Sequence, residues 1–129
     1  MIVVDTHTAI WLALEPERLS TKAAKAIQSA REVDGVAISD KTLWELAMAI
    51  SRGRLTIYTS MGDFLRTVER TFTVLPITGA IAERAVLFSD KFPKDPSDRI
   101  IAATAIVHGL KLVTSDSKIR KSNEVECIW

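Results

Sequence analysis

The order of apolar and polar positions along the chain predicts short strands that alternate with helices. Continuous apolar runs typical of buried strands predict strands at residues 2–4, 36–39, 72–77, 112–114 and 125–129. Helical spacing and helix-forming residues predict helices over residues 8–14, 21–33, 41–52, 61–70, 80–88 and 98–108. Because proline cannot donate a ladder hydrogen bond, the run that contains Pro76 is predicted at a sheet edge or a strand end.

This alternation is typical of βαβ units, which build a mostly parallel sheet with helices on both faces. We therefore predict a three-layer α/β/α fold of the α/β class, with a central sheet of about five short strands. A chain of 129 residues forms about one domain, so residues 1–129 are predicted to be a single domain. The hydrophobic content of 47% and charged content of 26% agree with a globular protein.

Composition also narrows the functional classes. No apolar run approaches the roughly 20 residues of a membrane span, and the N-terminus lacks the features of a signal peptide, so we expect a cytoplasmic protein. The single Cys127 cannot form an internal disulfide and is expected as a small buried thiol in the last strand. A net charge of +1 gives no global electrostatic case for nucleic-acid binding.

Four acidic residues fall where an α/β chain would bring them together. Asp5 follows the first strand, Glu45 lies in the apolar helix 41–52, Asp98 opens a helix, and Asp116 follows the strand at 112–114. Ligands of open parallel sheets gather at the carboxyl ends of the strands, and carboxylates that meet there repel unless a cation or protons intervene. Oxygen ligands suit Mg²⁺ or Mn²⁺ better than Zn²⁺, so these acids predict a site for such an ion.

Each acid also has a simpler interpretation. Asp5 and Asp116 can serve as helix caps or turn residues, and Asp98 can cap the helix that it opens, where Asp95 is a competitor. Glu45 is harder to explain in this way, because an acid in a buried apolar helix needs a partner and the nearest cations lie several residues away. One shared explanation for all four acids is simpler than four separate ones.

The four acids lie in a series of short motifs. The motifs are Val3-Val4-Asp5-Thr6-His7, Ile38-Ser39, Leu43-Trp44-Glu45-Leu46, Asp95-Pro96-Ser97-Asp98-Arg99-Ile100-Ile101-Ala102-Ala103-Thr104-Ala105 and Leu112-Val113-Thr114-Ser115-Asp116. Each motif is weak alone, but together they are fairly specific in this order and at these intervals. Through them the chain resembles the PIN-domain ribonucleases, and most of all the toxins of VapBC-type toxin–antitoxin pairs, over essentially its whole length.

The resemblance implies an acidic pocket that binds Mg²⁺ or Mn²⁺. Its catalytic acids would be Asp5, Glu45, Asp98 and Asp116, with Asp5 and Asp98 as metal ligands and the other two acting directly or through water. The family's third acid stands directly before a helix of the form Ile-Ile-Ala-Ala, which selects Asp98 over Asp95.

The resemblance also points to hydroxyl groups that support the site, at Thr6 and at Thr114 or Ser115. The chain departs from the family at His7, where many relatives have Asn or Ser. This side chain could form a hydrogen bond in the pocket, touch substrate or face solvent. A direct chemical role is not favoured, because metal-assisted hydrolysis can proceed without a histidine.

The implied activity is metal-dependent hydrolysis of RNA phosphodiester bonds. RNA must approach an acidic pocket, so nearby cations would have to steer its backbone, and the candidates are Arg52, Arg54 and Arg99. The implied partners are a small cognate antitoxin of the VapB type and a second copy of the chain in a homodimer. Three aromatic residues are candidates for such contacts, although buried packing is the favoured role for each: Trp11, Trp44 and Trp129.

Two other functional classes stay open at this point. A catalytically silent domain could keep the fold and bind only a protein, which the presence of all four acids argues against. A phosphoryl-transfer enzyme could use Asp5 as a nucleophile, but it needs a second acid at the Asp-x-Asp spacing, where this chain has His7. A test of metal dependence separates the silent domain from the nuclease.

Overall fold

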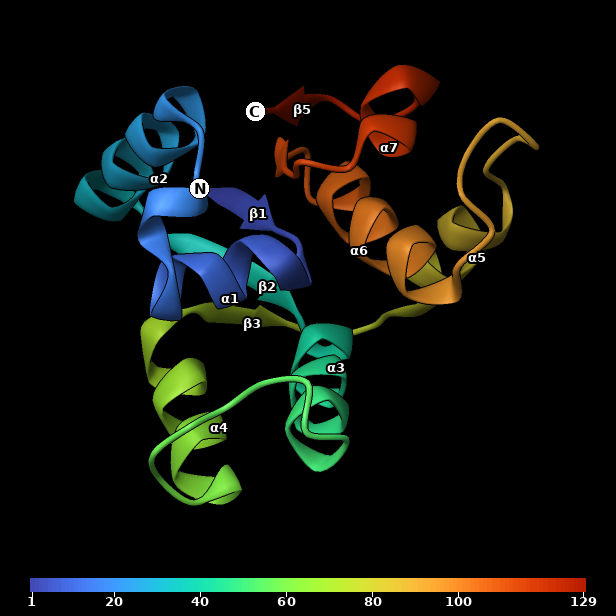
Figure 1. Cartoon of the computed structure of the whole chain (residues 1–129). Helices are drawn as coiled ribbons and strands as arrows, with labels where there is room; N and C mark the ends of the chain where they lie inside the picture. Colours follow the sequence, from blue (N-terminus) through green and yellow to red (C-terminus); the bar gives the residue numbers. More distant parts are fainter.

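The computed structural model describes residues 1–129 and contains one sheet of five parallel strands (Figure 1). The strands are β1 (Ile2–Val4), β2 (Val36–Ser39), β3 (Thr73–Leu75), β4 (Leu112–Val113) and β5 (Cys127–Ile128), in the spatial order β3-β2-β1-β4-β5. From the central β1 the chain moves outward to β2 and β3, and then crosses to β4 and β5 on the other side. The predicted mostly parallel sheet of about five short strands is confirmed.

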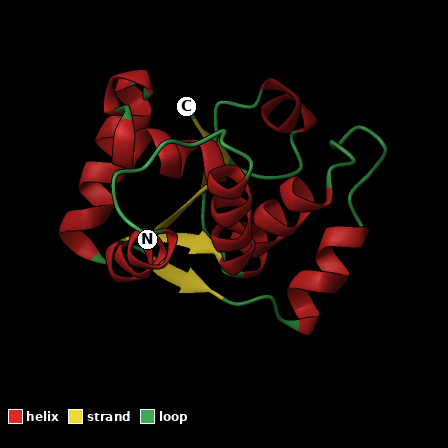
Figure 2. Ribbon diagram, turned by 60° about the horizontal axis from the view of Figure 1, so that its bottom comes forward, coloured by secondary structure: helices red, strands yellow, loops and turns green.

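Helices cover both faces of this sheet, as Figures 1 and 2 show. They are α1 (Thr6–Leu14), the 3₁₀ turn η1 (Pro16–Arg18), α2 (Thr21–Val33), α3 (Asp40–Ser51), α4 (Met61–Thr71), α5 (Gly79–Val86), α6 (Pro96–Val107) and α7 (Ser117–Ser122). None of them combines the length and the apolar character that a membrane crossing requires.

The core consists of two layers that the sheet separates. Val3, Ala37 and Leu112 belong to a cluster with buried residues of α5, α6 and α7. Their strand neighbours Val4 and Ile38 belong to a second cluster with residues of α1, α2, α3 and α4. Because successive strand residues point to opposite faces and both faces are buried, the strands appear in the sequence as continuous apolar runs. The predicted three-layer α/β/α architecture is confirmed.

Two helices begin earlier than predicted because aspartates cap them. Asp5 accepts a hydrogen bond from the backbone N–H of Thr8, so α1 begins at Thr6. Asp95 accepts from the backbone N–H of Ser97, so α6 begins at Pro96 rather than at residue 98. A carboxylate in the cap position satisfies an N–H group that the helix itself leaves free.

The prediction was wrong at the C-terminal end, where it missed α7. Ile119 is the only buried residue of that helix, so its sequence lacks the apolar periodicity that identifies longer helices. Asp116 instead caps the helix with two hydrogen bonds.

Two strands are shorter than predicted. The run at 72–77 contributes only Thr73–Leu75, and β3 lies at the sheet edge, as predicted from the position of Pro76. The last strand shortens to two residues, where Cys127 is half-buried and burial raises its thiol pKa to about 11.

Helix α3 is more exposed than its apolar composition indicates. Only Thr42 and Leu46 of this helix are buried, whereas the side chain of Trp44 is 55% exposed. Trp44, Glu45 and Met48 line a groove between α3 and α1, so part of the apolar surface of α3 faces this groove instead of the core.

Arg99 of α6 holds the loop that follows α5. Its Nε donates to the carbonyl oxygen of Pro93 at 2.8 Å, and its Nη1 donates to that of Phe88 at 3.3 Å. Its Nη2 lies 3.3 and 3.4 Å from the carbonyl oxygens of Ser89 and Phe92. Phe92 is 1% exposed and stacks on Phe88 with a centroid distance of 4.0 Å, so the guanidinium fixes a loop that completes the core.

We predict that Arg99→Ala lowers the free energy of unfolding by about 2–3 kcal/mol, because it leaves partly buried carbonyl groups without a charged donor. Urea denaturation followed by circular dichroism measures this change. Arg66→Ala, which removes an exposed arginine of α4, is the control and should change stability by less than about 1 kcal/mol. Equal stability of the two variants would contradict the role of Arg99 in the loop.

Candidate functional site

The candidate site lies where two neighbouring parallel strands end. Val4 of β1 pairs with Val113 of β4, so the residues that follow each strand come side by side. A cavity of about 460 Å³ opens at this point. The carboxylates that line it are Asp5, Glu45, Asp95, Asp98 and Asp116. The structure thus brings all four predicted acids together, and it adds Asp95.

Two donors hold Asp5 in place. Its Oδ1 accepts from the backbone N–H of Thr8 at 2.9 Å, and its Oδ2 accepts from the hydroxyl of Thr114, which is fully buried. The oxygen of Thr114 in turn accepts from the backbone N–H of Asp116 at 3.1 Å. Thr114 therefore connects the two strand ends through these hydrogen bonds.

Asp116 is fixed by its role at the start of α7. Its Oδ1 accepts from the backbone N–H groups of Lys118 at 2.8 Å and Ile119 at 3.0 Å. Its Oδ2 accepts no hydrogen bond from the protein and remains available to the cavity. Asp116 is therefore both a helix cap and a lining residue of the cavity.

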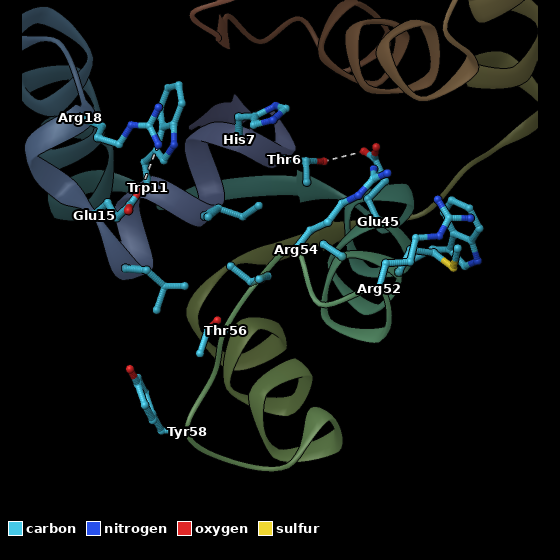
Figure 3. A pocket seen from close by; sticks show the side chains of 16 residues that line it. Thr6, His7, Trp11, Glu15, Arg18, Glu45, Arg52, Arg54, Thr56 and Tyr58 are labelled. Atoms are coloured by element: carbon cyan, nitrogen blue, oxygen red, sulfur yellow. Dashed lines mark hydrogen bonds and ion pairs between the residues drawn. The ribbon is translucent and has the colours of Figure 1, made fainter.

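Glu45 is positioned by a chain of two hydroxyl groups. The hydroxyl of Thr6 donates to Oε1 of Glu45 at 2.6 Å (Figure 3), and the hydroxyl oxygen of Thr42 lies 3.1 Å from that of Thr6. Because the single proton of Thr6 goes to Glu45, Thr42 must donate to Thr6. The fully buried Thr42 was not predicted, although it stands three residues before Glu45 on the same face of α3.

The acids influence one another electrostatically at Asp98. This half-buried carboxyl has a pKa raised from 3.8 to about 7, first by burial and then by the charges of Asp95, Asp116, Glu45 and Asp5. The negative charges are therefore concentrated in the cavity and are not neutralised by ion pairs there. Such an arrangement favours the uptake of a cation or a proton.

The donor set fits a hydrated, hard divalent cation. No three of the acidic, histidine or cysteine side chains are close enough together to hold a metal ion directly. Mg²⁺ is usually bound through one or two carboxylates and keeps several of its waters, so it requires no closed cage of protein ligands. The lining offers carboxylate and hydroxyl oxygens, with His7 as the single imidazole, which suits Mg²⁺ or Mn²⁺ rather than structural zinc.

A larger groove of about 740 Å³ adjoins the acidic cavity and runs between α1 and α3. Thr6, His7 and Glu45 line both hollows, so the groove and the cavity adjoin at these residues. Figure 3 shows the three side chains in the groove. Arg52 and Arg54 line the groove near the end of α3. Half of the 16 residues that line the groove are hydrophobic.

Of the remaining residues considered for the site, two line the acidic cavity and one does not. Ser115 lines the acidic cavity, and the exposed His7 lies 5.9 Å from Trp11 between ring centroids. Arg99 does not join them: it lines neither hollow, and its guanidinium is bound to the carbonyl groups of residues 88–93. The expectation that Arg99 binds substrate is therefore corrected to a structural role.

Sequence analysis missed Arg18, which lines both hollows together with Trp11. It lies in η1, and the sequence around Pro16 indicates only the end of a helix. No motif in the sequence singles out this arginine, because its proximity to the acids arises from the way η1 follows α1.

We predict that the stability of the metal-free protein depends on pH through Asp98. Because the native pKa of about 7 exceeds the ordinary value of 3.8, the native state binds more protons than the unfolded chain between these values. The stabilising contribution of Asp98 is therefore complete below pH 3.8 and is lost as the pH rises through about 7. Relative to wild type, Asp98→Asn should become progressively more stable as the pH rises from 3.8 to about 7. Urea unfolding in the presence of EDTA measures this difference.

Asp90→Asn is the matched control for this experiment, because Asp90 is exposed and lies outside the cavity. The free-energy difference between this variant and wild type should stay nearly constant over the same pH range. A constant difference for Asp98→Asn as well would show that Asp98 does not take up a proton in the cavity.

Comparisons with known proteins show to which family the chain belongs. A model of the PIN domain matches residues 2–124. Ribonuclease VapC22 of Mycobacterium tuberculosis (strain ATCC 25618 / H37Rv) is 38% identical over 119 residues, which cover 92% of this chain and 89% of that protein.

Solved structures show the same fold. A toxin–antitoxin complex from Klebsiella pneumoniae contains a chain that is 26% identical, with a TM-score of 0.67 over 96% of this chain and 93% of that chain. VapBC2 from Rickettsia felis, bound to a DNA fragment from its promoter, gives a TM-score of 0.72 at 14% identity over 98% and 97% of the two chains. The family match and the 38% identical relative both span most of the sequence, and the chain belongs to the PIN domain family.

Proposed function

We propose that this chain is a divalent-metal-dependent endoribonuclease that hydrolyses RNA phosphodiester bonds. The observation that carries the proposal is the group of carboxylates around one cavity at the ends of β1 and β4, where burial and then the neighbouring charges raise the pKa of Asp98. The relative that is 38% identical is named a ribonuclease, which supports RNA as the substrate.

The chain's own residues would hold Mg²⁺ or Mn²⁺ through Asp5 and Asp98, with Glu45 and Asp116 acting directly or through water. When bound, the ion lowers the pKa of a water molecule and stabilises negative charge on the phosphate. Asp5 is already oriented by Thr8 and Thr114, and Asp116 by the N-terminus of α7. These carboxylates therefore need little reorganisation when the ion binds.

The hydroxyl pair on Glu45 contributes in a different way. Thr6 occupies Oε1, which leaves Oε2 of Glu45 without a protein donor and able to orient a water in the cavity. Arg52 and Arg54 line the adjoining groove and would attract the RNA backbone, which offsets the repulsion between phosphates and the acids. The groove is open along α1 and α3, which suits a single strand of RNA.

We further propose that the chain is the toxin of a toxin–antitoxin pair. The chains from Klebsiella pneumoniae and Rickettsia felis occur in complexes with antitoxins, and they resemble this chain over nearly its whole length. We expect a small VapB-like antitoxin that covers the groove and a homodimer of the toxin. We expect this pair to work in the cytoplasm, where RNA is accessible.

The purified protein, freed from any antitoxin, is predicted to cleave a mixed RNA pool with Mg²⁺ or Mn²⁺ and not with EDTA. Asp5→Asn should lower the cleavage rate by about 100-fold or more, because it removes a charge that would bind the ion. Gel electrophoresis of end-labelled RNA measures both effects, and Asp90→Asn should cleave like wild type. Cleavage that persists in EDTA, or a folded protein that binds no divalent ion, would exclude the proposed mechanism and favour the silent interaction domain.

The buried Thr42 gives a second test of the same site. Thr42→Val keeps the shape of the side chain but removes the donor to Thr6, so the Thr6 hydroxyl that donates to Glu45 is no longer held in one orientation. We expect the cleavage rate to fall by about 10-fold, as for other residues that orient metal ligands. Thr42→Ser keeps the hydroxyl and should restore most of the rate. Equal rates for the Val and Ser variants would show that this hydroxyl chain does not support catalysis.

A further inference from the structure

The acidic cavity and the groove meet at a junction that contains a single arginine. Of the residues that line the acidic cavity, only Arg18 carries a lysine or arginine charge. Arg52 and Arg54 line the groove but not the acidic cavity. Figure 3 shows Arg18 beside Trp11 on the α1 side of the groove, whereas Arg52 and Arg54 come from the α3 side. Arg18 is therefore the one arginine at the place where the groove joins the cavity.

The guanidinium group of Arg18 is held in a defined position. Its central carbon lies 4.6 Å from the centroid of the Trp11 ring, and its Nη1 donates to Oε2 of Glu15 at 3.1 Å. Trp11 in turn contacts His7 and Trp129, with centroid distances of 5.9 and 5.8 Å. The aromatic ring thus restrains the planar guanidinium beside the acidic cavity.

Most of the N–H groups of Arg18 are free of protein acceptors. Glu15 accepts the one hydrogen bond that Arg18 donates within the protein, whereas Arg99 donates to four carbonyl groups. The pair of Arg18 and Glu15 is exposed, with 56% and 48% of the two side chains accessible to solvent. Such pairs contribute little to stability, so a phosphate can replace the carboxylate at small cost.

We propose that Arg18, oriented by Trp11, binds an RNA phosphate next to the one that is cleaved. The inference rests on the ribonuclease function proposed above and adds a specific substrate contact to it. The planar guanidinium can donate two parallel hydrogen bonds to a phosphate, and its charge offsets the repulsion that the nearby carboxylates exert on RNA. Arg18 therefore guides the backbone from the groove into the acidic cavity.

The chain offers a closely matched control for this proposal. Arg66 of α4 is also exposed, with 63% of its side chain accessible, and it also pairs with an acid three residues before it, Asp63. It lines neither the groove nor the cavity. Arg18→Gln and Arg66→Gln thus remove the same charge from the same kind of ion pair, inside and outside the junction.

The experiment measures binding of a fluorescein-labelled pool of single-stranded RNA, about ten nucleotides long, by anisotropy at several salt concentrations. All variants carry Asp5→Asn so that the RNA is not cleaved. We expect Arg18→Gln to weaken binding about fivefold and to reduce the salt dependence by about one phosphate contact, or roughly 0.7 in slope. Arg18→Lys keeps the charge but loses the planar group. Its affinity for RNA should lie between the affinities of Arg18→Gln and of the parent protein.

The outcomes separate the inference from the function on which it rests. If wild type cleaves RNA, but Arg18→Gln binds as well as Arg66→Gln with the same salt slope, the inference is wrong and the ribonuclease function stands. If wild type neither binds nor cleaves RNA, the proposed function fails and the inference fails with it. Binding by Arg18→Lys equal to that of the parent protein would overturn the role given to the planar guanidinium group. Thermal unfolding shows whether each variant is folded.

Discussion

Repulsion among carboxylates at the ends of β1 and β4 is the constraint on which the rest of the site depends. Parallel pairing of Val4 with Val113 brings Asp5 close to Asp116, and α3 and α6 add Glu45 and Asp98. Neutral donors, namely threonine hydroxyls and backbone N–H groups, fix three of these acids. Because neutral donors leave the negative charge uncompensated, the acids are held in place while their charges still favour a cation or a proton.

The side chains that cap three helices in this fold also line the acidic cavity. Asp5, Asp95 and Asp116 each accept N–H groups at a helix N-terminus while they line the acidic cavity. The positive end of a helix dipole stabilises a carboxylate, so three helices lower the cost of bringing these charges together. The same aspartate can therefore be both a helix cap and a lining residue of the cavity, although the sequence presents these two roles as alternatives.

Sequence patterns predicted what depends on local periodicity and missed what depends on tertiary packing. The apolar runs predicted the strands, and the short motifs predicted the four acids. Both kinds of prediction depend only on residues that are adjacent in the sequence. Helix α7 was missed because Ile119 alone is buried in it. Thr42 was missed because its partner Thr6 lies 36 residues away in the chain and is brought beside it by the pairing of β1 with β2.

The two arginines show why proximity in sequence is a poor guide to function. Arg99 directly follows Asp98, but one residue along a helix turns the side chain by about 100°, which directs it away from the acids and onto the loop at residues 88–93. Its N–H groups are used by the protein, so a phosphate would have to displace partly buried carbonyls. Arg18 is distant in sequence from Asp98, yet it reaches the same cavity with most of its donors free. The number of unsatisfied donors that face the site distinguishes a cation that can bind substrate from one that holds the fold.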